Sequence, residues 1–294
     1  MDAADAFPPH FPIRMGEYCM KIGFIGAGNM GGAILKGALK SGYLSADEVM
    51  IYDLNEALTE TWVRQFGVTI AQSNRELAQC CEWVVLAVKP VFLEGVLKEI
   101  APVMKNQKVI SIAAGWSVEM LKSALNGCEG IQLLRVMPNT PALVGAGLSA
   151  LCEETSLDAE SFVWAQRLFG TLGVVQIVPE RLIDAVIAVS GSSPAYVFMF
   201  IDAMADAAVK LGMPRQMAIE AAAQAVMGSA KMVLDTHLHP AVLKDQVCSP
   251  GGTTIEAVQA LEEGGMRAAV IKAMVACADK NRQMTEAQNR SPKA

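Results

Sequence analysis

The sequence predicts an α/β protein in which a doubly wound parallel sheet is followed by a domain made only of helices. Three observations support this. Apolar strand-like segments alternate with amphipathic segments from residue 21 to residue 178, a glycine-rich turn follows the first strand, and no strand pattern occurs after Pro179. We therefore expect a loosely ordered tail at 1–19, a sheet domain at 20–179 and a helical domain at 180–294.

Strands and helices can be assigned in order along the first domain. Continuous apolar runs indicate strands, and apolar residues at intervals of three or four indicate helices. Gly67 follows one helix directly and is expected to end it as a C-cap. The predicted strands are 21–25, 49–53, 68–71, 83–88, 109–113, 131–136, 146–151 and 173–178, and the predicted helices are 33–41, 56–66, 74–81, 91–101, 117–125 and 158–172.

The second domain is rich in alanine and methionine and shows only helical periodicity, over 182–189, 195–211, 215–234, 240–247, 254–261 and 266–284. Methionine side chains fill irregular apolar gaps. A helical bundle with its own core would explain the many methionines, but a domain this apolar more readily shares its core with a partner chain. We expect a homodimer through this domain. The methionines concerned are Met199, Met204, Met213, Met217, Met227 and Met232.

Composition excludes several classes of protein. The net charge is −6 and the basic residues are scattered, so nucleic acid and anionic membranes are not expected partners. The apolar stretch 183–201 carries Asp184 and Pro194 and is not expected to span a membrane. Seven cysteines without a C-x-x-C pair and three histidines give no metal site. Reduced thiols fit a cytoplasmic protein.

The glycine-rich turn has the pattern Gly26-x-Gly28-x-x-Gly31 between a strand and a helix, which is typical of the Rossmann dinucleotide-binding domain. The first glycine makes the tight turn, the second lets a pyrophosphate approach the backbone, and the third allows the helix to pack closely on the sheet. The alternative is a tight turn that binds no ligand. We predict that Gly26, Ala27, Gly28, Asn29, Met30 and Gly31 bind NADPH or NADH.

Three further residues follow predicted strands at the edge where cofactors bind in this fold. Asp53 ends the second strand, where a carboxylate would bond a ribose 2′-hydroxyl and favour NADH; alternatively it caps the loop at 54–56. Lys89 would reach a phosphate or ribose, or is simply solvated. Asn139 lies between two prolines and would orient the ligand's amide, or it is a turn residue.

A second glycine-rich turn interrupts the helical domain at 249–255, which reads SPGGTTI. Helix starts expose backbone N–H groups that attract anions, and glycines allow close approach. With the hydroxyls of Thr253 and Thr254 beside them, these groups would form a cradle for a small carboxylate. An ordinary capped turn is the alternative.

Five segments together resemble the pyrroline-5-carboxylate reductase family over residues 20–285. They are KIGFIGAGNMG at 21–31, AVKP at 87–90, RVMPNTP at 135–141, VSGSSPAYV at 189–197 and SPGGTTIE at 249–256. The resemblance implies a Rossmann domain, a helical dimerisation domain, and dimers that often assemble into a ring of five. It also implies reduction of L-1-pyrroline-5-carboxylate to L-proline, usually with NADPH.

The same resemblance implies roles for individual residues. Thr254 would be the catalytic residue, meeting the ring nitrogen, and Glu180 would approach the substrate. Asp53 and His237 depart from the family pattern, which leaves the cofactor preference open and the role of His237 in doubt. The substrate carboxylate would be held by Ser249, Gly251, Gly252 and Thr253, and the rest of the cofactor cleft would be lined by Asn74, Ala87, Val88, Lys89, Pro90, Ile112, Ala113 and Ala114.

Two other functions are compatible with a dinucleotide-binding domain followed by helices. A 2-hydroxyacid or 6-phosphogluconate-type dehydrogenase would need a lysine for acid–base work, and Lys210 and Lys231 are the candidates. A non-catalytic dinucleotide-binding protein would keep the glycine turn and lose the hydroxyls of Thr253 and Thr254, which are present.

Overall fold

The computed structural model describes residues 20–290, so the predicted tail at 1–19 lies outside the described residues. The chain forms two compact units. Unit 1 extends to Ala113 and includes Val118–Arg135 and Thr155–Thr171; unit 2 comprises Ala114–Ser117, Val136–Glu154 and the chain from Leu172 on. The predicted boundary at 179 falls inside unit 2, because two strands that precede it are grouped with the helices.

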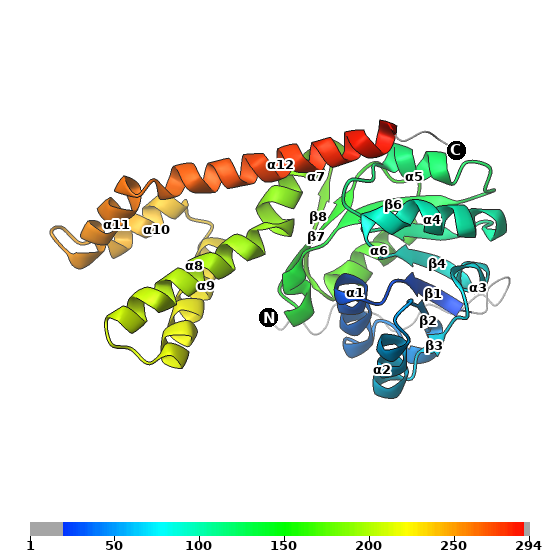
Figure 1. The fold of residues 1–294 in the computed structure, drawn as a ribbon, viewed down its shortest axis with the longest axis horizontal. Helices are drawn as coiled ribbons and strands as arrows, with labels where there is room; N and C mark the ends of the chain where they lie inside the picture. Colours follow the sequence, from blue (N-terminus) through cyan, green and yellow to red (C-terminus); the bar gives the residue numbers. More distant parts are fainter. Residues whose placement is uncertain (1–19, 291–294) are drawn as a thin grey trace. The chain divides into compact units, whose positions relative to one another are not determined.

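Unit 1 contains a parallel sheet in the order β3-β2-β1-β4-β5-β6, as expected for a Rossmann-type domain (Figure 1). The central β4 is buried along nearly its whole length, which agrees with its apolar sequence. The strands are β1 (Met20–Ile25), β2 (Val49–Tyr52), β3 (Thr69–Ile70), β4 (Cys81–Leu86), β5 (Lys108–Ser111) and β6 (Gln132–Met137), the last two residues of which belong to unit 2.

The helices of unit 1 follow the predicted pattern closely. Helix α2 has the predicted bounds, and Gly67 ends it in the left-handed conformation at φ 75°. Helix α1 begins earlier than its apolar periodicity suggested, so the end of the glycine turn is itself helical. The helices are α1 (Asn29–Lys40), α2 (Glu56–Phe66), α3 (Asn74–Cys80), α4 (Pro90–Ile100), α5 (Val118–Ala124) and α6 (Ala159–Gly170).

Unit 2 begins with a change of strand direction. Strand β7 (Gly147–Cys152) is antiparallel to the end of β6, whereas β8 (Gly173–Val178) is parallel to β7. The expectation of a parallel sheet throughout is therefore wrong at this pair. The connection at 138–146 contains one short 3-10 turn, Thr140–Val144, and a parallel crossover needs about a dozen residues or more.

Helices make up the rest of unit 2. Helices α8 and α9 pack side by side, and α12 returns past α7 (Figure 1). Asn281 of α12 donates a hydrogen bond of 2.7 Å to the Asp184 carboxylate of α7, which fixes this packing. The helices are α7 (Ile183–Val186), a π-helical turn (Ile187–Gly191), α8 (Ser193–Lys210), α9 (Arg215–Thr236), α10 (Pro240–Val247), α11 (Thr253–Glu263) and α12 (Met266–Arg290).

Large apolar side chains are exposed along these helices. Phe198 and Met199 of α8 are 64% and 73% exposed, and Met217 and Met227 of α9 are 57% and 58% exposed. The helical stretch Glu180–Lys210 is long and apolar enough to cross a membrane by length and composition, a test that helices of soluble proteins also pass. The expectation that 183–201 does not span a membrane stays a prediction. An exposed apolar surface of this kind is typical of an interaction site, and either a partner chain or a membrane would bury it.

Candidate functional site

The glycine turn of unit 1 is held by hydrogen bonds on both sides of Ala27. The backbone N–H of Ala27 donates to the Asp53 carboxylate at 2.9 Å, and the Ala27 carbonyl accepts from the Trp62 indole nitrogen at 3.2 Å. The Gly26 N–H donates to the Tyr52 carbonyl at 2.8 Å, which continues the strand ladder into the turn. The turn is therefore fixed before any ligand binds.

The three glycines of the motif have different surroundings, and the difference locates a ligand site. Gly26 has φ 94°, and a Cβ there would strike the Ala87 carbonyl. A Cβ on Gly31 would strike the Gly26 carbonyl oxygen and the Ala87 side chain. A Cβ on Gly28 would meet nothing within 4 Å. Gly28 is thus the position where the turn faces open space.

Helix α1 starts beside that open space without a side-chain cap. Gly28 is its N-cap and carries no side chain, and its first turn contains no acidic residue. The N–H groups of the first turn are therefore available to an anion, which the helix dipole also favours. The residues present fit a dinucleotide pyrophosphate, and the role of Gly26 to Gly31 in binding it stays a prediction.

Asp53 directly follows β2 and is half-buried. One carboxylate oxygen accepts from Ala27, and the other accepts from the backbone N–H of Asn55 at 3.0 Å. The second contact is the loop-capping role that the sequence left open for Asp53. Each carboxylate oxygen offers about two acceptor sites, so both can still receive a ribose hydroxyl.

The other predicted cofactor residues of unit 1 follow neighbouring strands. The N–H of Ala87 donates to Ile25 and that of Ile112 donates to Leu86, so both loops start at the carboxyl edge of the sheet. Val88 is half-buried there, Ala113 is buried, and Lys89 is exposed beside Pro90 at the start of α4. Ala114 belongs to unit 2.

Asn74 is buried at the start of α3 and is only partly satisfied. Its amide nitrogen donates to Glu99 at 2.7 Å, while its Oδ1 atom meets no donor among the described residues. A buried acceptor without a partner is uncommon, because leaving it unpaired costs about 1–3 kcal/mol. A ligand hydroxyl or amine that reached this atom would satisfy it, and the role of Asn74 stays a prediction.

The second glycine turn lies in unit 2, between α10 and α11. The Gly252 N–H donates to the Ser249 carbonyl at 3.0 Å, and Gly251 has φ 66°, a conformation that suits glycine. Gly252 is the N-cap of α11 and makes no side-chain cap. Neither Ser nor Thr closes this helix start, which favours the anion cradle over an ordinary capped turn.

The hydroxyl residues of this turn differ in exposure. Thr253 is exposed on the first residue of α11, and Thr254 behind it is half-buried. Ser249 and Gly251 are exposed, so the turn is open to a small ligand. The residues predicted to bind a carboxylate and a neighbouring polar atom are therefore brought together within one turn and one helix start.

Two predicted site residues take part in the internal structure of unit 2. The Asn139 amide donates to the Ser190 carbonyl and hydroxyl at 3.2 and 3.0 Å and accepts from the Leu148 N–H at 2.9 Å. These contacts match the turn role that the sequence left open for Asn139. Glu180 donates its backbone N–H to the Glu154 carboxylate at 2.6 Å and is half-buried at the start of the 3-10 turn that follows β8.

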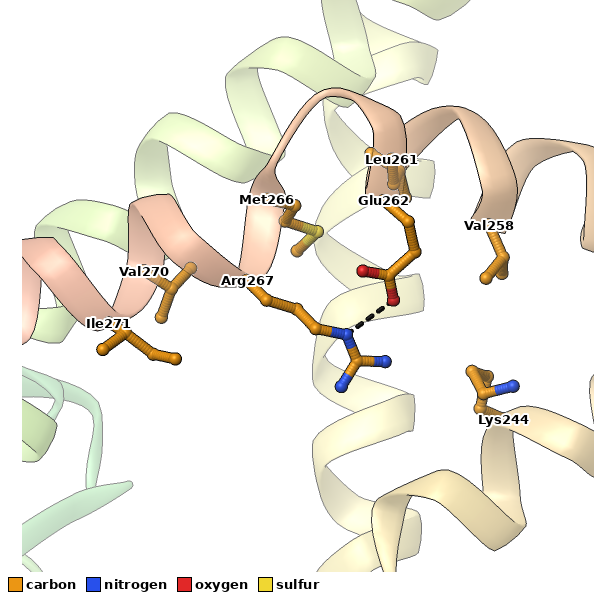
Figure 2. Close-up of a pocket in the computed structure, with 8 residues that line it drawn as sticks. All are labelled: Lys244, Val258, Leu261, Glu262, Met266, Arg267, Val270 and Ile271. Atoms are coloured by element: carbon orange, nitrogen blue, oxygen red, sulfur yellow. Dashed lines mark hydrogen bonds and ion pairs between the residues drawn. The ribbon is translucent and has the colours of Figure 1, made fainter.

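A hollow of about 440 Å³ lies between α10, α11 and α12 (Figure 2). Its walls are mostly apolar, and an ion pair between Arg267 and Glu262 crosses its rim at 2.5 Å. None of the predicted site residues lines it. The lining residues are Lys244, Val258, Leu261, Glu262, Met266, Arg267, Val270 and Ile271.

Comparison with known proteins identifies the family. Residues 180–284 match the model described as pyrroline-5-carboxylate reductase dimerisation, and residues 21–115 match that described as NADP oxidoreductase coenzyme F420-dependent. Pyrroline-5-carboxylate reductase from Escherichia coli is 48% identical over 90% of this chain and 98% of its own length. The chain belongs to the pyrroline-5-carboxylate reductase family.

Other members of the pyrroline-5-carboxylate reductase family agree in sequence and in fold. The Methanosarcina acetivorans reductase is 39% identical over 90% of this chain and 97% of its own length. The solved Plasmodium falciparum reductase with NADP bound has a TM-score of 0.83 at 30% identity, over 92% of this chain and all of that one. The Streptococcus pyogenes structure has a TM-score of 0.80 at 34% identity, over 90% and 98%.

Sequence reasoning missed two residues beside the cofactor turn. Trp62 lies on the buried face of α2, and its periodicity indicated core packing but not the bond that its indole makes to Ala27. Leu54 directly follows Asp53 and is 86% exposed. A lone leucine in a predicted turn gives no signal that would have identified it.

Proposed function

We propose that this chain reduces the cyclic imine of L-1-pyrroline-5-carboxylate to L-proline with NADPH or NADH, the last step of proline biosynthesis. The observation that carries the proposal is the uncapped start of α11 at Gly252, with Ser249 and Thr254 beside it. A helix start of this kind suits a carboxylate. Membership of the pyrroline-5-carboxylate reductase family indicates which carboxylate is the substrate.

The residues of unit 1 hold the cofactor. The first-turn N–H groups of α1 and the open face of Gly28 receive the pyrophosphate, and the loops after β4 and β5 line the rest of the cleft. When bound, the nicotinamide cofactor supplies the hydride, which is the difficult part of the chemistry. The protein then has to position the substrate, and positioning alone contributes about 7–11 kcal/mol in favourable cases.

The residues of unit 2 hold the substrate. The backbone of Gly251, Gly252 and Thr253, with the Ser249 hydroxyl, binds the carboxylate, and the Thr254 hydroxyl orients the ring nitrogen. A protonated imine is already electrophilic, so the reaction needs no dedicated acid–base side chain.

The dehydrogenase alternative has less support. Lys231 is paired with Asp235 along the exposed face of α9 at 2.5 Å, and Lys210 is exposed in the last turn of α8. Neither lysine is placed in a turn that could hold a hydroxyacid. The paired, solvated lysine has the surroundings of a helix-surface residue.

The assembly follows from the exposed apolar face of unit 2. The match to the dimerisation model covers 180–284 and includes α8 and α9, whose phenylalanine and methionine side chains are exposed. We propose a homodimer through these helices, with a further assembly of five dimers as the family resemblance implies. A dimer that covers this face fits a cytoplasmic enzyme without membrane or nucleic-acid partners.

Enzyme assays with both cofactors test the proposal. The protein is mixed with racemic pyrroline-5-carboxylate and either NADH or NADPH, and the absorbance of the reduced cofactor is followed. We expect oxidation that depends on the imine, with proline as the product. If neither cofactor is oxidised when the protein is folded and oligomeric, the proposal is wrong.

Replacing Thr254 tests the catalytic assignment. Thr254→Ala removes the hydroxyl that orients the imine nitrogen, and we expect kcat/KM for the imine to fall at least about tenfold, or about 1.4 kcal/mol. Thr61→Ala is the control, because Thr61 is also a half-buried helical threonine and its hydroxyl donates within its own helix, to the Ala57 carbonyl. An unchanged kcat/KM in Thr254→Ala would remove Thr254 from the site.

A further inference from the structure

We propose that Asp53 makes this chain select NADH over NADPH. The inference rests on the proposed dinucleotide-binding function and goes beyond it, because it assigns the cofactor from this chain's own residues. Asp53 bonds the Ala27 N–H at 2.9 Å and the Asn55 N–H at 3.0 Å. Its carboxylate is therefore fixed beside the pyrophosphate turn, at the end of β2, where the adenosine ribose lies in this fold.

The two backbone bonds prevent the carboxylate from turning away from a ligand. A solvated aspartate could rotate to make room for a 2′-phosphate, but Asp53 would have to give up both N–H partners to do so. Its free acceptor sites suit a 2′-hydroxyl, which donates a hydrogen bond. A 2′-phosphate has no such donor when ionised and brings negative charge against negative charge.

The charges on the elements around Asp53 reinforce this selection. From Ser41 to Val63 the chain has no lysine or arginine and five acidic residues, Asp47, Glu48, Asp53, Glu56 and Glu60. The basic residues on either side of this stretch, Lys40 and Arg64, lie in the last turns of α1 and α2. On the neighbouring α3, Arg75 is the exposed basic residue in the first turn. Arg75 is the side chain that would bind a 2′-phosphate if the inference were wrong, so it belongs in the test.

Trp62 provides a matched control for the structural role of Asp53. Both side chains hold the backbone of Ala27: the Asp53 carboxylate accepts from its N–H, and the Trp62 indole donates to its carbonyl. Trp62→Phe loses the indole bond and keeps most of the packing without changing any charge. Loosening of the turn and loss of charge discrimination can therefore be separated.

The binding experiment uses two fragments that differ only in a 2′-phosphate. The affinities of 5′-AMP and 2′,5′-ADP are measured by calorimetry on the folded protein, beside kcat and KM with NADH and NADPH. We expect the wild type to bind 5′-AMP at least about tenfold tighter, or about 1.4 kcal/mol. In Asp53→Asn, which keeps one acceptor and loses the charge, we expect this preference to shrink below threefold.

The control variants have different expected results. Trp62→Phe should raise KM for NADH and NADPH by the same factor and leave the ratio of the two KM values unchanged, and Arg75→Gln should leave the fragment preference intact. A wild type that binds 2′,5′-ADP as well as or better than 5′-AMP overturns the inference, even if Asp53→Asn fails to fold. Imine-dependent oxidation of NADPH in preference to NADH would overturn it while leaving the proposed function standing.

Discussion

At the scale of single residues, each of the three glycines in the glycine turn is required for a different reason. Gly26 is required by its backbone angle and Gly31 by the atoms that a side chain would strike, whereas Gly28 is required by neither. The need for glycine at position 28 therefore comes from what binds there. A structural and a ligand-imposed glycine can be told apart by experiment.

Gly28→Ala should leave stability almost unchanged and weaken cofactor binding, because its Cβ enters the space proposed for the pyrophosphate. We expect KM for the cofactor to rise at least about tenfold, while the melting temperature stays within a few degrees of the wild type. Gly31→Ala should instead lower the melting temperature, because its Cβ strikes the Gly26 carbonyl. Gly95→Ala, on the exposed face of α4, serves as the control.

The opposite pattern would contradict this assignment. If Gly28→Ala unfolded the protein and left KM unchanged in the folded fraction, Gly28 would be a structural residue. Thermal unfolding followed by circular dichroism and steady-state kinetics on the same preparations give both quantities.

Both turns could be proposed as binding sites from the sequence because each has a local signature, a glycine spacing in one and a Ser-Pro-Gly-Gly run in the other. The bond from Trp62 to Ala27 joins residues that are 35 positions apart, and no local pattern encodes it. The partners of Asn139 and the unsatisfied oxygen of Asn74 were hidden for the same reason. Such contacts depend on how elements pack, which a single sequence shows poorly.

At the scale of elements, an ion triad joins neighbouring strands of unit 1. Glu82 of β4 accepts from Lys21 of β1 at 2.8 Å and from Lys108 of β5 at 2.7 Å. Burial raises the pKa of Glu82, but the hydrogen bonds from Lys108 and Lys21 outweigh this and hold it below its usual value. The ionised carboxylate therefore stabilises the order of these three strands.

Glu82→Gln should lose stability at neutral pH and lose less of it in acid. Because the folded pKa of Glu82 is depressed, its contribution is present above the usual value of 4.5 and disappears as the pH falls through the folded pKa. We expect a loss of about 1 kcal/mol at pH 7, since the group is partly exposed and the solvent screens it. Urea unfolding at neutral and acidic pH measures the difference.

Glu94→Gln gives the reference for this experiment, because Glu94 makes an exposed ion pair with Lys98 on α4. Its loss should change the free energy of unfolding by about 0.3–0.5 kcal/mol at most. A Glu82→Gln variant as stable as this reference at every pH would show that the triad contributes nothing to the strand order.

Element positions were largely predictable, with two instructive exceptions. The bounds of α2 and α10 agree with the predicted ones because each helix has a residue that marks one of its ends. Gly67 is the C-cap of α2, and Pro240 is the first residue of α10. The start of α1 was missed because glycines conceal helical periodicity. The direction of β7 was missed because apolar runs look the same in parallel and antiparallel strands.

At the scale of the whole molecule, the exposed apolar side chains of unit 2 require an oligomer. Met227 of α9 is 58% exposed in a single chain and lies within the dimerisation match. Met227→Glu would place a charge in an apolar interface, and we expect the subunit dissociation constant to rise at least about tenfold. Light scattering over a dilution series measures the change, with Thr61→Glu as the control on unit 1.

A wild-type protein that stays monomeric at every concentration would contradict the proposed homodimer. The sequence predicted an oligomer from composition alone, because apolar helices without enough polar residues to cover them need a partner. It could not predict the number of subunits, because symmetry is set by the geometry between surfaces and leaves no mark on composition.

Because the chain passes repeatedly between its two compact units, recombination between related genes is restricted. The chain crosses from one unit to the other after Ala113, Ser117, Arg135, Glu154 and Thr171. Neither unit corresponds to one uninterrupted stretch of codons, so a single crossover cannot exchange either unit whole, and a crossover between Ala114 and Thr171 divides both. Exchanging one unit alone would need several crossovers. Chimaeras of related reductases should therefore tolerate swapped surface loops better than swapped halves of the chain.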